Sequence, residues 1–458
     1  MKFGGTSVKD GSSILHCAKL VKRYSNDNEI VVVVSAMAGV TDALVNVAEK
    51  CCVERSHGHI KLFVADMMKR HYEAVETAVK NEDIKSKVYS ILSSLFDELE
   101  KVLLGISYLG ELTNRSRDYI LSFGERLLAP IFSATLISLG VNSVALTGGD
   151  AGVVTDRNFG RAKPLSKAYE LIRKRIEPLI RINRIVPVVT GFIGATEDGI
   201  ITTLGRGGSD LTATLIASAI DADEVWLWKE VDGIMTADPK IVPNARVIPE
   251  ISYQEAMELS HFGAKILHPK ALEPVIKKRI PVRIKNTFNP DGEGTVICEA
   301  TKSSKDIVKA LSLIEKVAIV NVSGAGFDFA EIMSKVFRRL ANAKVNVIMV
   351  AQSSSELNLS IVIEKSDLGK ALEALEDLNG ENVKITKKED IAVVSAVGAG
   401  MAGTPGVAGR IFSALGRNGI NVIMISQSCS EYNVSFAVRR EEGRDAVKVI
   451  HDEFNLGE

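Results

Sequence analysis

The chain has few cysteines, no long apolar run and no excess of charge of either sign. Its five cysteines among 458 residues are odd in number and form no Cys-x-x-Cys pair. A disulfide framework or a structural zinc site is therefore not supported, and we interpret the cysteines as reduced thiols of a cytoplasmic protein. The longest apolar run, Ile30–Val40, is broken by Ser35 and Gly39. It is too short to span a bilayer, which takes about 20 residues, so no membrane segment is predicted.

The charge balance also narrows the choice of partners. Lys and Arg number 56 against 57 Asp and Glu, which gives a net charge of −1. Proteins that bind nucleic acid usually carry a basic patch and a high pI, so no nucleic-acid partner is predicted. The composition, 46% hydrophobic and 25% charged, is that of a soluble globular protein, and the length favours about three domains.

The first two-thirds of the chain alternates strand and helix patterns, which predicts a mostly parallel sheet covered by helices. The expected strands are Glu29–Ser35, Ile185–Thr190, Gly199–Thr203, Glu224–Lys229 and Pro281–Lys285, and the expected helices are Ala43–Lys50, Leu211–Ile220 and Tyr253–Ser260. Residues 58–105 are glycine-poor and mixed in charge, which indicates a helical insertion packed beside the sheet. A turn cluster at Thr287–Gly294 places the main domain boundary near residue 300.

The last third contains an internal repeat. The segments starting at Asn346 (NVIMVAQSSSELNLSI) and Asn421 (NVIMISQSCSEYNVSF) share ten of sixteen positions at an offset of 75 residues. Each copy predicts the order strand, Gly-rich turn, helix, strand, strand, helix, which is a βαββα unit of roughly 70 residues. The alternative, chance similarity between two small α/β units, is disfavoured by the number of identities.

A glycine-rich segment, TTLGRGGSD at Thr202–Asp210, follows an expected strand and precedes a helix. Glycines allow the backbone to present N–H groups to an anion, and the helix N-terminus adds positive potential. Arg206 adds a bidentate donor suited to a carboxylate or phosphate. Ser209 or Asp210 can cap this helix. The alternative is an ordinary glycine-rich turn capped by Ser209. The spacing fits neither GxGxxG nor the P-loop, so neither of those mechanisms is implied.

Three further motifs are each ambiguous by themselves. KFGGTS at Lys2–Ser7 places a lysine beside a Gly-Gly turn, or is simply a flexible terminus. SFGER at Ser122–Arg126 is either a polar stripe with a function or the solvated face of an amphipathic helix. FGAKILHP at Phe262–Pro269 offers Lys265 to a ligand, or has only a surface lysine and a structural histidine.

Taken together, these motifs are specific. KFGGTS, VSAMAGVTDAL at Val34–Leu44, SFGER, GFIG at Gly191, TTLGRGGSD, VDGIMTADP at Val231 and FGAKILHP occur in one order. The chain resembles the aspartate kinases, of the monofunctional type with two C-terminal ACT domains. The resemblance implies an α/β amino acid kinase-type three-layer sandwich with a mostly parallel sheet over residues 1–300. Two βαββα, ferredoxin-like ACT domains would follow at 301–385 and 386–458.

The resemblance also implies the reaction and the roles of residues. ATP, with Mg²⁺ carried mainly on its phosphates rather than in a protein metal cage, would phosphorylate the side chain of L-aspartate. That carboxylate is already ionised at pH 7, so no general base is required. The implied catalytic residues are Lys2 and Asp210, and the implied aspartate-binding residues are Thr41, Glu125, Phe192, Arg206 and Ser209. The implied nucleotide-binding residues are Lys2, Phe3, Gly4, Gly5, Lys229, Glu230 and Lys265, although Lys229-Glu230 departs from the family's usual Thr-Asp.

The repeat predicts regulation. Amide and hydroxyl groups near the strand ends of each copy could hold an amino-acid effector, lysine or threonine, between paired ACT domains. The residues proposed for this role are Asn346, Gln352, Asn358, Asn421, Gln427 and Asn433; alternatively they only satisfy turns at the sheet edge. The pairing implies a homodimer, or a tetramer built from it. Two other functions remain open: a kinase for another acidic amino acid, and an amino-acid-sensing subunit without catalysis.

Overall fold

The structure, a computed structural model, describes residues 1–53, 58–263, 267–299, 306–324, 329–353, 357–378, 380 and 383–458. The chain forms two compact units. The first comprises Met1–Gly233 and Lys270–Glu299, and the second comprises Ile234–Pro269 and Ala300–Glu458. A junction between units thus falls at residue 299, next to the predicted boundary. Residues 234–269, which the sequence places in the N-terminal domain, pack within the second unit.

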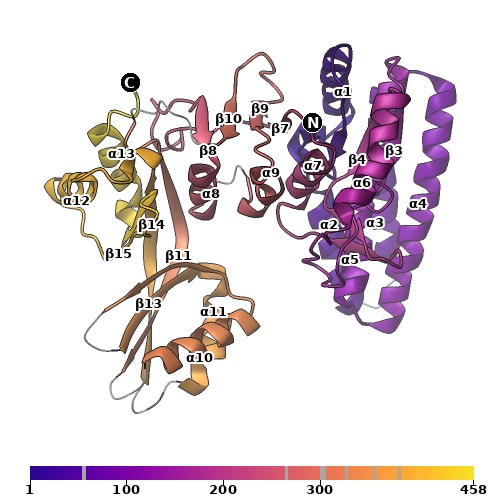
Figure 1. Cartoon of the computed structure of the whole chain (residues 1–458). Coiled ribbons are helices and arrows are strands. Elements are labelled where there is room, and N and C mark those ends of the chain that lie inside the picture. The colour runs from indigo at the N-terminus through magenta and orange to yellow at the C-terminus, as the bar shows by residue number, and fades with distance from the viewer. Residues whose placement is uncertain are drawn as a thin grey trace. The chain divides into compact units, whose positions relative to one another are not determined.

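The first unit is built around a mostly parallel sheet (Figure 1). Its strands lie in the order β3-β4-β2-β1-β7-β9-β10. Their bounds are β1 Lys2–Phe3, β2 Val32–Val34, β3 Ser143–Leu146, β4 Val186–Thr190, β7 Val225–Lys229, β9 Val282–Asn286 and β10 Thr295–Cys298. All neighbours are parallel except β9 and β10. A separate antiparallel hairpin joins β5 (Ile193–Ala195) and β6 (Ile201–Thr203).

Helices cover this sheet, as the alternating pattern predicts. Their bounds are α1 Gly11–Ser25, α2 Val40–Val53, α3 Gly58–Ala78, α4 Glu82–Leu109, α5 Asn114–Ser138, α6 Ala168–Glu177, α7 Gly208–Ala219 and α9 Glu273–Ile276. Phe3, Trp228 and the apolar side of α5 share one core. The predicted helical insertion is confirmed as α3 and α4, which pack against α1, α2 and α5.

Helix α5 is the central helix of the first unit. By length and composition alone it could cross a membrane, but 83% of its apolar window is buried inside the protein. Ser122 and Glu125 are buried on it, and Arg126 pairs with Glu98 of α4 at 2.9 Å. The reading of SFGER as a solvated face is therefore wrong, because the polar side chains of this motif face the interior.

The second unit carries the repeat on one antiparallel sheet of order β12-β13-β11-β14-β16-β15. The first module contains β11 Ala310–Gly324, α10 Phe329–Asn342, β12 Val347–Gln352, β13 Leu357–Glu364 and α11 Leu368–Leu375. The second contains α12 Val407–Arg417, β15 Met424–Ser426, β16 Asn433–Arg439 and α13 Gly443–Glu453. The unit also holds β8 (Glu250–Ser252) and α8 (Tyr253–His261). The order βαββα in each module confirms the predicted repeat.

The first strands of the two modules, β11 and β14, pair with each other. Strand β14 (Val383–Val397) pairs along Val383–Lys388 with β11 of the first module and along Ile391–Val397 with β16 of the second. The start of β11, Ala310–Ile314, pairs in turn with Val393–Val397. The expected division between residues 385 and 386 therefore falls inside one continuous strand, because the modules are joined edge to edge by their backbones.

Candidate active site

Three charged side chains from separate elements meet where parallel strands of the first unit meet the start of α7. Lys2 lies on β1, Lys229 ends β7, and Asp210 lies in the first turn of α7. The ammonium of Lys2 is 2.6 Å from one Asp210 oxygen, and that of Lys229 is 2.9 Å from the other. The Lys2 and Asp210 side chains are each only 7% exposed. Parallel strands bring these residues together because their ends share one edge of the sheet.

The electrostatics of this cluster favour an anion. Burial alone would raise the pKa of Asp210, but the charges of Lys2 and Lys229 outweigh it and lower the pKa to about 2. Burial lowers the pKa of Lys2, and the charge of Asp210 opposes this shift. Two lysines thus share one carboxylate, which leaves positive charge in a buried site where a phosphate would be stabilised strongly.

Glu125 reaches the same region from α5. A Cβ at Gly124 would lie 2.7 Å from the Cβ of Ala36, so only glycine allows the helix to approach the loop after β2 this closely. Glu125 is 3% exposed, and its Oε2 has no hydrogen-bond partner among the described residues. Burial raises its pKa to about 8, although the backbone of Ala36 and the charge of Lys2 oppose the shift. A buried, unpartnered carboxyl oxygen is costly by itself and suits a cationic ligand group.

The glycine-rich segment forms the predicted turn between β6 and α7. Gly205 and Gly207 have φ of +75° and +76°, a conformation that favours glycine. Gly207 is the N-cap of α7 and no side chain caps the helix. The expectation that Ser209 or Asp210 caps α7 is therefore wrong, since both lie within its first turn. Arg206, at the tip, is exposed and has no hydrogen bond or ion pair with another residue in the described part of the chain.

The GFIG motif packs against the start of α7. Phe192 has a φ of +66°, which is unusual for a non-glycine residue and is typical of strained functional positions. Its N–H donates to Thr212 Oγ1 at 3.2 Å, and its carbonyl accepts from Leu204 N–H at 2.9 Å. A Cβ at Gly191 would lie 2.7 Å from the Cβ of Ser209. The structure thus places Gly191, the neighbour of Phe192 in the chain, against Ser209.

The remaining predicted substrate and nucleotide residues are placed as follows. Thr41 is half-buried in the first turn of α2. Gly4 and Gly5 lead into a single 3₁₀ turn, Gly5–Val8, so KFGGTS is an ordered turn rather than a flexible end. The Phe3 ring is fully buried and stacks on Trp228, which leaves only its backbone for a nucleotide contact. Glu230 is exposed after β7, and Lys265 lies outside the described residues.

The predicted effector residues fall into two groups. Asn346, Gln352, Asn358, Asn421 and Gln427 are exposed at or near strand ends. Asn433 is 5% exposed, and its amide donates to Glu258 of α8. The repeated asparagines thus have different environments in the two modules.

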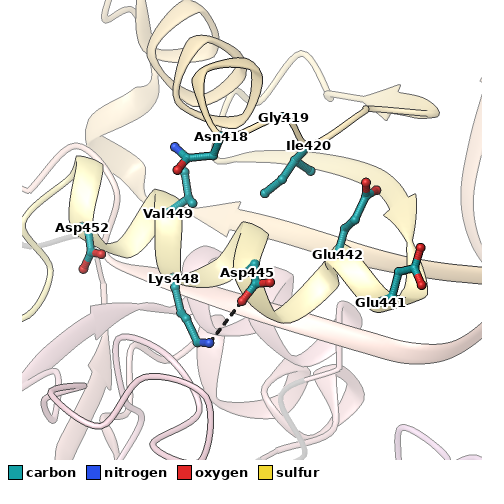
Figure 2. Close-up of a pocket in the computed structure, with 9 residues that line it drawn as sticks. All are labelled: Asn418, Gly419, Ile420, Glu441, Glu442, Asp445, Lys448, Val449 and Asp452. Atoms are coloured by element: carbon teal, nitrogen blue, oxygen red, sulfur yellow. Dashed lines mark hydrogen bonds and ion pairs between the residues drawn. The ribbon is translucent and has the colours of Figure 1, made fainter.

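A surface hollow of about 580 Å³ lies elsewhere, on the second module (Figure 2). Figure 2 shows acidic side chains around it, among them Glu441, Glu442 and Asp452, while Lys448 bonds Asp445 at 3.1 Å. It shares no residue with the Lys2–Asp210 cluster.

The residues present fit a nucleotide polyphosphate better than a protein-bound metal ion. The described residues contain no group of three His, Cys, Asp or Glu side chains that could hold a metal ion. Both Asp210 oxygens already form ion pairs with lysines, one with Lys2 and one with Lys229.

Comparisons with known proteins give the family of the chain. A family model described as the amino acid kinase family matches residues 1–286, and an ACT domain model matches residues 320–378 and 394–454. The chain belongs to the amino acid kinase family. It is 34% identical over 477 residues to aspartokinase 3, chloroplastic, of Arabidopsis thaliana, which covers 99% of this chain and 81% of the relative. It is 31% identical to the bifunctional aspartokinase/homoserine dehydrogenase of Buchnera aphidicola and spans 56% of that protein.

Solved structures give the same family. The crystal structure of E. coli aspartokinase III in complex with aspartate and ADP matches this kinase with a TM-score of 0.82 at 27% identity, over 99% of both chains. The complex of that enzyme with lysine and aspartate matches with a TM-score of 0.80 at 27% identity, over 99% of this chain and 98% of the other. The predicted three-layer kinase fold with C-terminal ACT domains is therefore confirmed.

Proposed function

We propose that the chain is an aspartate kinase, which transfers the γ-phosphoryl group of ATP to the side chain of L-aspartate and gives 4-phospho-L-aspartate. The observation that carries this proposal is the buried Lys2–Asp210–Lys229 cluster together with Glu125, a buried carboxyl with one oxygen unpartnered among the described residues. The cluster suits a phosphate and the carboxyl suits an ammonium. A substrate that needs both is an amino acid undergoing phosphoryl transfer.

The mechanism requires positioning and charge stabilisation. A carboxylate oxygen of aspartate attacks the γ-phosphorus, the bond from this phosphorus to the ADP oxygen breaks, and ADP leaves. The attacking carboxylate is ionised at pH 7 and yields no proton, so no general base is needed. Lys2 and Lys229 stabilise the charge on the transferring group, and Asp210 holds both ammonium groups in place. Mg²⁺ bound with the nucleotide would supply further charge neutralisation.

The substrate is oriented from both ends. Glu125 binds the α-ammonium of aspartate, while Arg206 reaches from the exposed loop tip to its α-carboxylate. Phe192, Ser209 and Thr41 line the pocket between them. Gly4 and Gly5 contact the phosphate oxygens, and Glu230 and Lys265 contribute to the nucleotide side. Lys229 contacts Asp210, so the departure from the family's Thr-Asp adds a cation to the phosphate site.

Regulation belongs to the second unit. We propose that an end-product amino acid, lysine or threonine, binds the exposed polar strand ends of the ACT domains and inhibits the kinase. We further propose a cytoplasmic enzyme with chains paired through these domains, as a homodimer or a tetramer. The E. coli enzyme of the comparison was crystallised with lysine, which supports an amino-acid effector.

A coupled assay of ADP release tests the reaction. With ATP and Mg²⁺, ADP release is expected with aspartate and not with glutamate or N-acetylglutamate, and Lys2→Ala serves as the inactive control. Release with another acidic amino acid alone would assign a different substrate. No release with any of them, from folded protein that still binds lysine or threonine, would assign a sensing subunit.

A further inference from the structure

Asp118 is a fully buried carboxylate that none of the sequence motifs includes. It lies on α5 with 0% of its surface exposed. Its Oδ2 accepts from the N–H groups of Gly160 and Thr203, both at 2.9 Å, and its Oδ1 accepts from Thr203 Oγ1 at 2.7 Å. No cation pairs with it among the residues that the structure describes. The carboxylate is therefore satisfied only by donors from one loop and from the end of strand β6, and such a buried group is retained at a cost.

These contacts anchor the loop that carries Arg206. Thr203 is the last residue of β6, and Arg206 follows three residues later. The second contact, Gly160, belongs to a loop beside the same turn, since a Cβ at Gly205 would lie 3.1 Å from the Gly160 carbonyl oxygen. Ala162 N–H also donates to the Thr203 carbonyl at 2.9 Å. Asp118 thus joins both sides of the base of the loop to one rigid helix.

The same helix carries Glu125, seven residues further along. Two turns of α-helix bring positions i and i+7 to one face, and both side chains are buried there. We infer that Asp118 is a positioning residue that fixes the distance between Glu125, which binds the substrate ammonium, and Arg206, which binds its α-carboxylate. This inference rests on the proposed function. It concerns which substrates fit rather than how phosphate is transferred.

The phosphate site does not depend on this anchor. Asp210 is held by its ion pairs with Lys2 and Lys229. The first turn of α7 is further held by Thr212, whose Oγ1 donates to the Gly208 carbonyl at 2.9 Å. Loosening the base of the loop should therefore displace Arg206 and leave the transferring group in place.

Steady-state kinetics of Asp118→Ala and Asp118→Asn test the inference. Removal of the carboxylate should raise the KM for aspartate by about tenfold or more, since small misplacements of binding groups have large effects. The kcat and the KM for ATP should change by less than about threefold. Asp118→Asn should restore most of the aspartate affinity, because its amide oxygen can accept from both N–H groups while its NH₂ donates to the Thr203 hydroxyl. A fall in kcat together with a rise in the KM values for both aspartate and ATP would overturn the inference.

A double-mutant cycle decides whether Asp118 acts through Arg206. In the Arg206→Ala background, Asp118→Ala should raise the aspartate KM no further, whereas full additivity of the two effects would refute the inference. Should Asp118→Ala not fold, Thr203→Val replaces it in the cycle. This variant should raise the KM for aspartate by about twofold to threefold. Asp198→Asn is the matched control, since Asp198 bonds Arg157 and Thr196 at the opposite end of the β5–β6 hairpin; its kinetics should equal those of the wild type. A wild-type enzyme inactive on aspartate would refute the proposed function instead.

Discussion

Arg206 has no partner in the described part of the free protein, so its contribution should appear only when substrate is bound. Arg206→Lys should raise the KM for aspartate strongly, because a lysine cannot reproduce a planar two-donor contact to a carboxylate. Loss of one charged hydrogen bond corresponds to about 2–3 kcal/mol. Steady-state kinetics check this. An unchanged aspartate KM with a raised ATP KM would place Arg206 on the nucleotide side.

Lys2 should act on the chemical step. The ammonium lies in a buried ion pair with Asp210, and charge stabilisation of a moving phosphoryl group is greatest in the transition state. Lys2→Ala should therefore lower kcat far more than it raises either KM. Circular dichroism confirms that the variant is folded. Near-normal turnover would remove Lys2 from the catalytic set.

Glu125 should impose a pH dependence on aspartate capture. Burial raises its pKa in the free protein to about 8, and only the ionised form attracts the substrate ammonium. The value of kcat/KM for aspartate, which reports groups of the free enzyme, should rise with pH up to about 8 and then level off. Glu125→Gln should abolish this rise, and Glu98→Gln on α4 should keep it. A flat wild-type profile between pH 6.5 and 8 would contradict the assignment.

The same shift predicts a stability effect of defined sign. The pKa of Glu125 is raised from 4.5 to about 8 on folding, so the free protein loses stability as the pH rises through this window. Glu125→Gln should therefore melt at a higher temperature than the wild type at pH 8, and the difference should shrink below pH 4.5. Thermal unfolding without substrate measures it.

At the scale of elements, helix α8 is fastened to the second module through Glu255. This carboxylate is fully buried. It closes a capping box with Ser252 and accepts from Ala399 N–H at 2.6 Å and from Lys309 at 3.2 Å. Burial would raise its pKa, but these donors outweigh it and the pKa is lowered. The contribution to stability is therefore present above the ordinary carboxyl pKa and is lost on acidification.

Glu255→Gln should destabilise the protein by about 3–5 kcal/mol, because it leaves Lys309 buried without its counter-charge. Thermal unfolding at pH 7 is the measurement, and the loss should diminish as the pH falls below about 4.5, where an unfolded carboxyl is protonated. Gln254→Ala, exposed in the same turn, is the control. Equal melting temperatures of Glu255→Gln and the wild type would contradict the role of this contact.

At the scale of the whole molecule, the two ACT modules should transmit an effector signal to the kinase. Gln352 is exposed at the end of β12, and its amide can hold an amino acid without a formal charge. Gln352→Ala should relieve inhibition by the effector while leaving uninhibited kcat intact. A coupling of about 1–3 kcal/mol corresponds to a 5- to 150-fold shift in affinity.

Titration of the wild type with lysine and with threonine identifies the effector, and Gln427→Ala in the second module tells whether both copies bind it. If neither amino acid binds or inhibits, the repeat has a role in assembly alone.

The sequence by itself determined the elements, the repeat and the loop of Arg206, because periodicity, glycine spacing and β-branched runs act locally. It also predicted Lys2, Glu125 and Asp210 as one site through their resemblance to a family. Only the tertiary structure decided the rest. Lys229 joins Lys2 at Asp210 because the strands that carry the two lysines, β1 and β7, are neighbours in the sheet. Residues 234–269 pack within the second unit. Asp118 carried no local signal, since its two partner residues, Gly160 and Thr203, lie 42 and 85 residues away. Contacts at that separation are set by packing rather than by pattern.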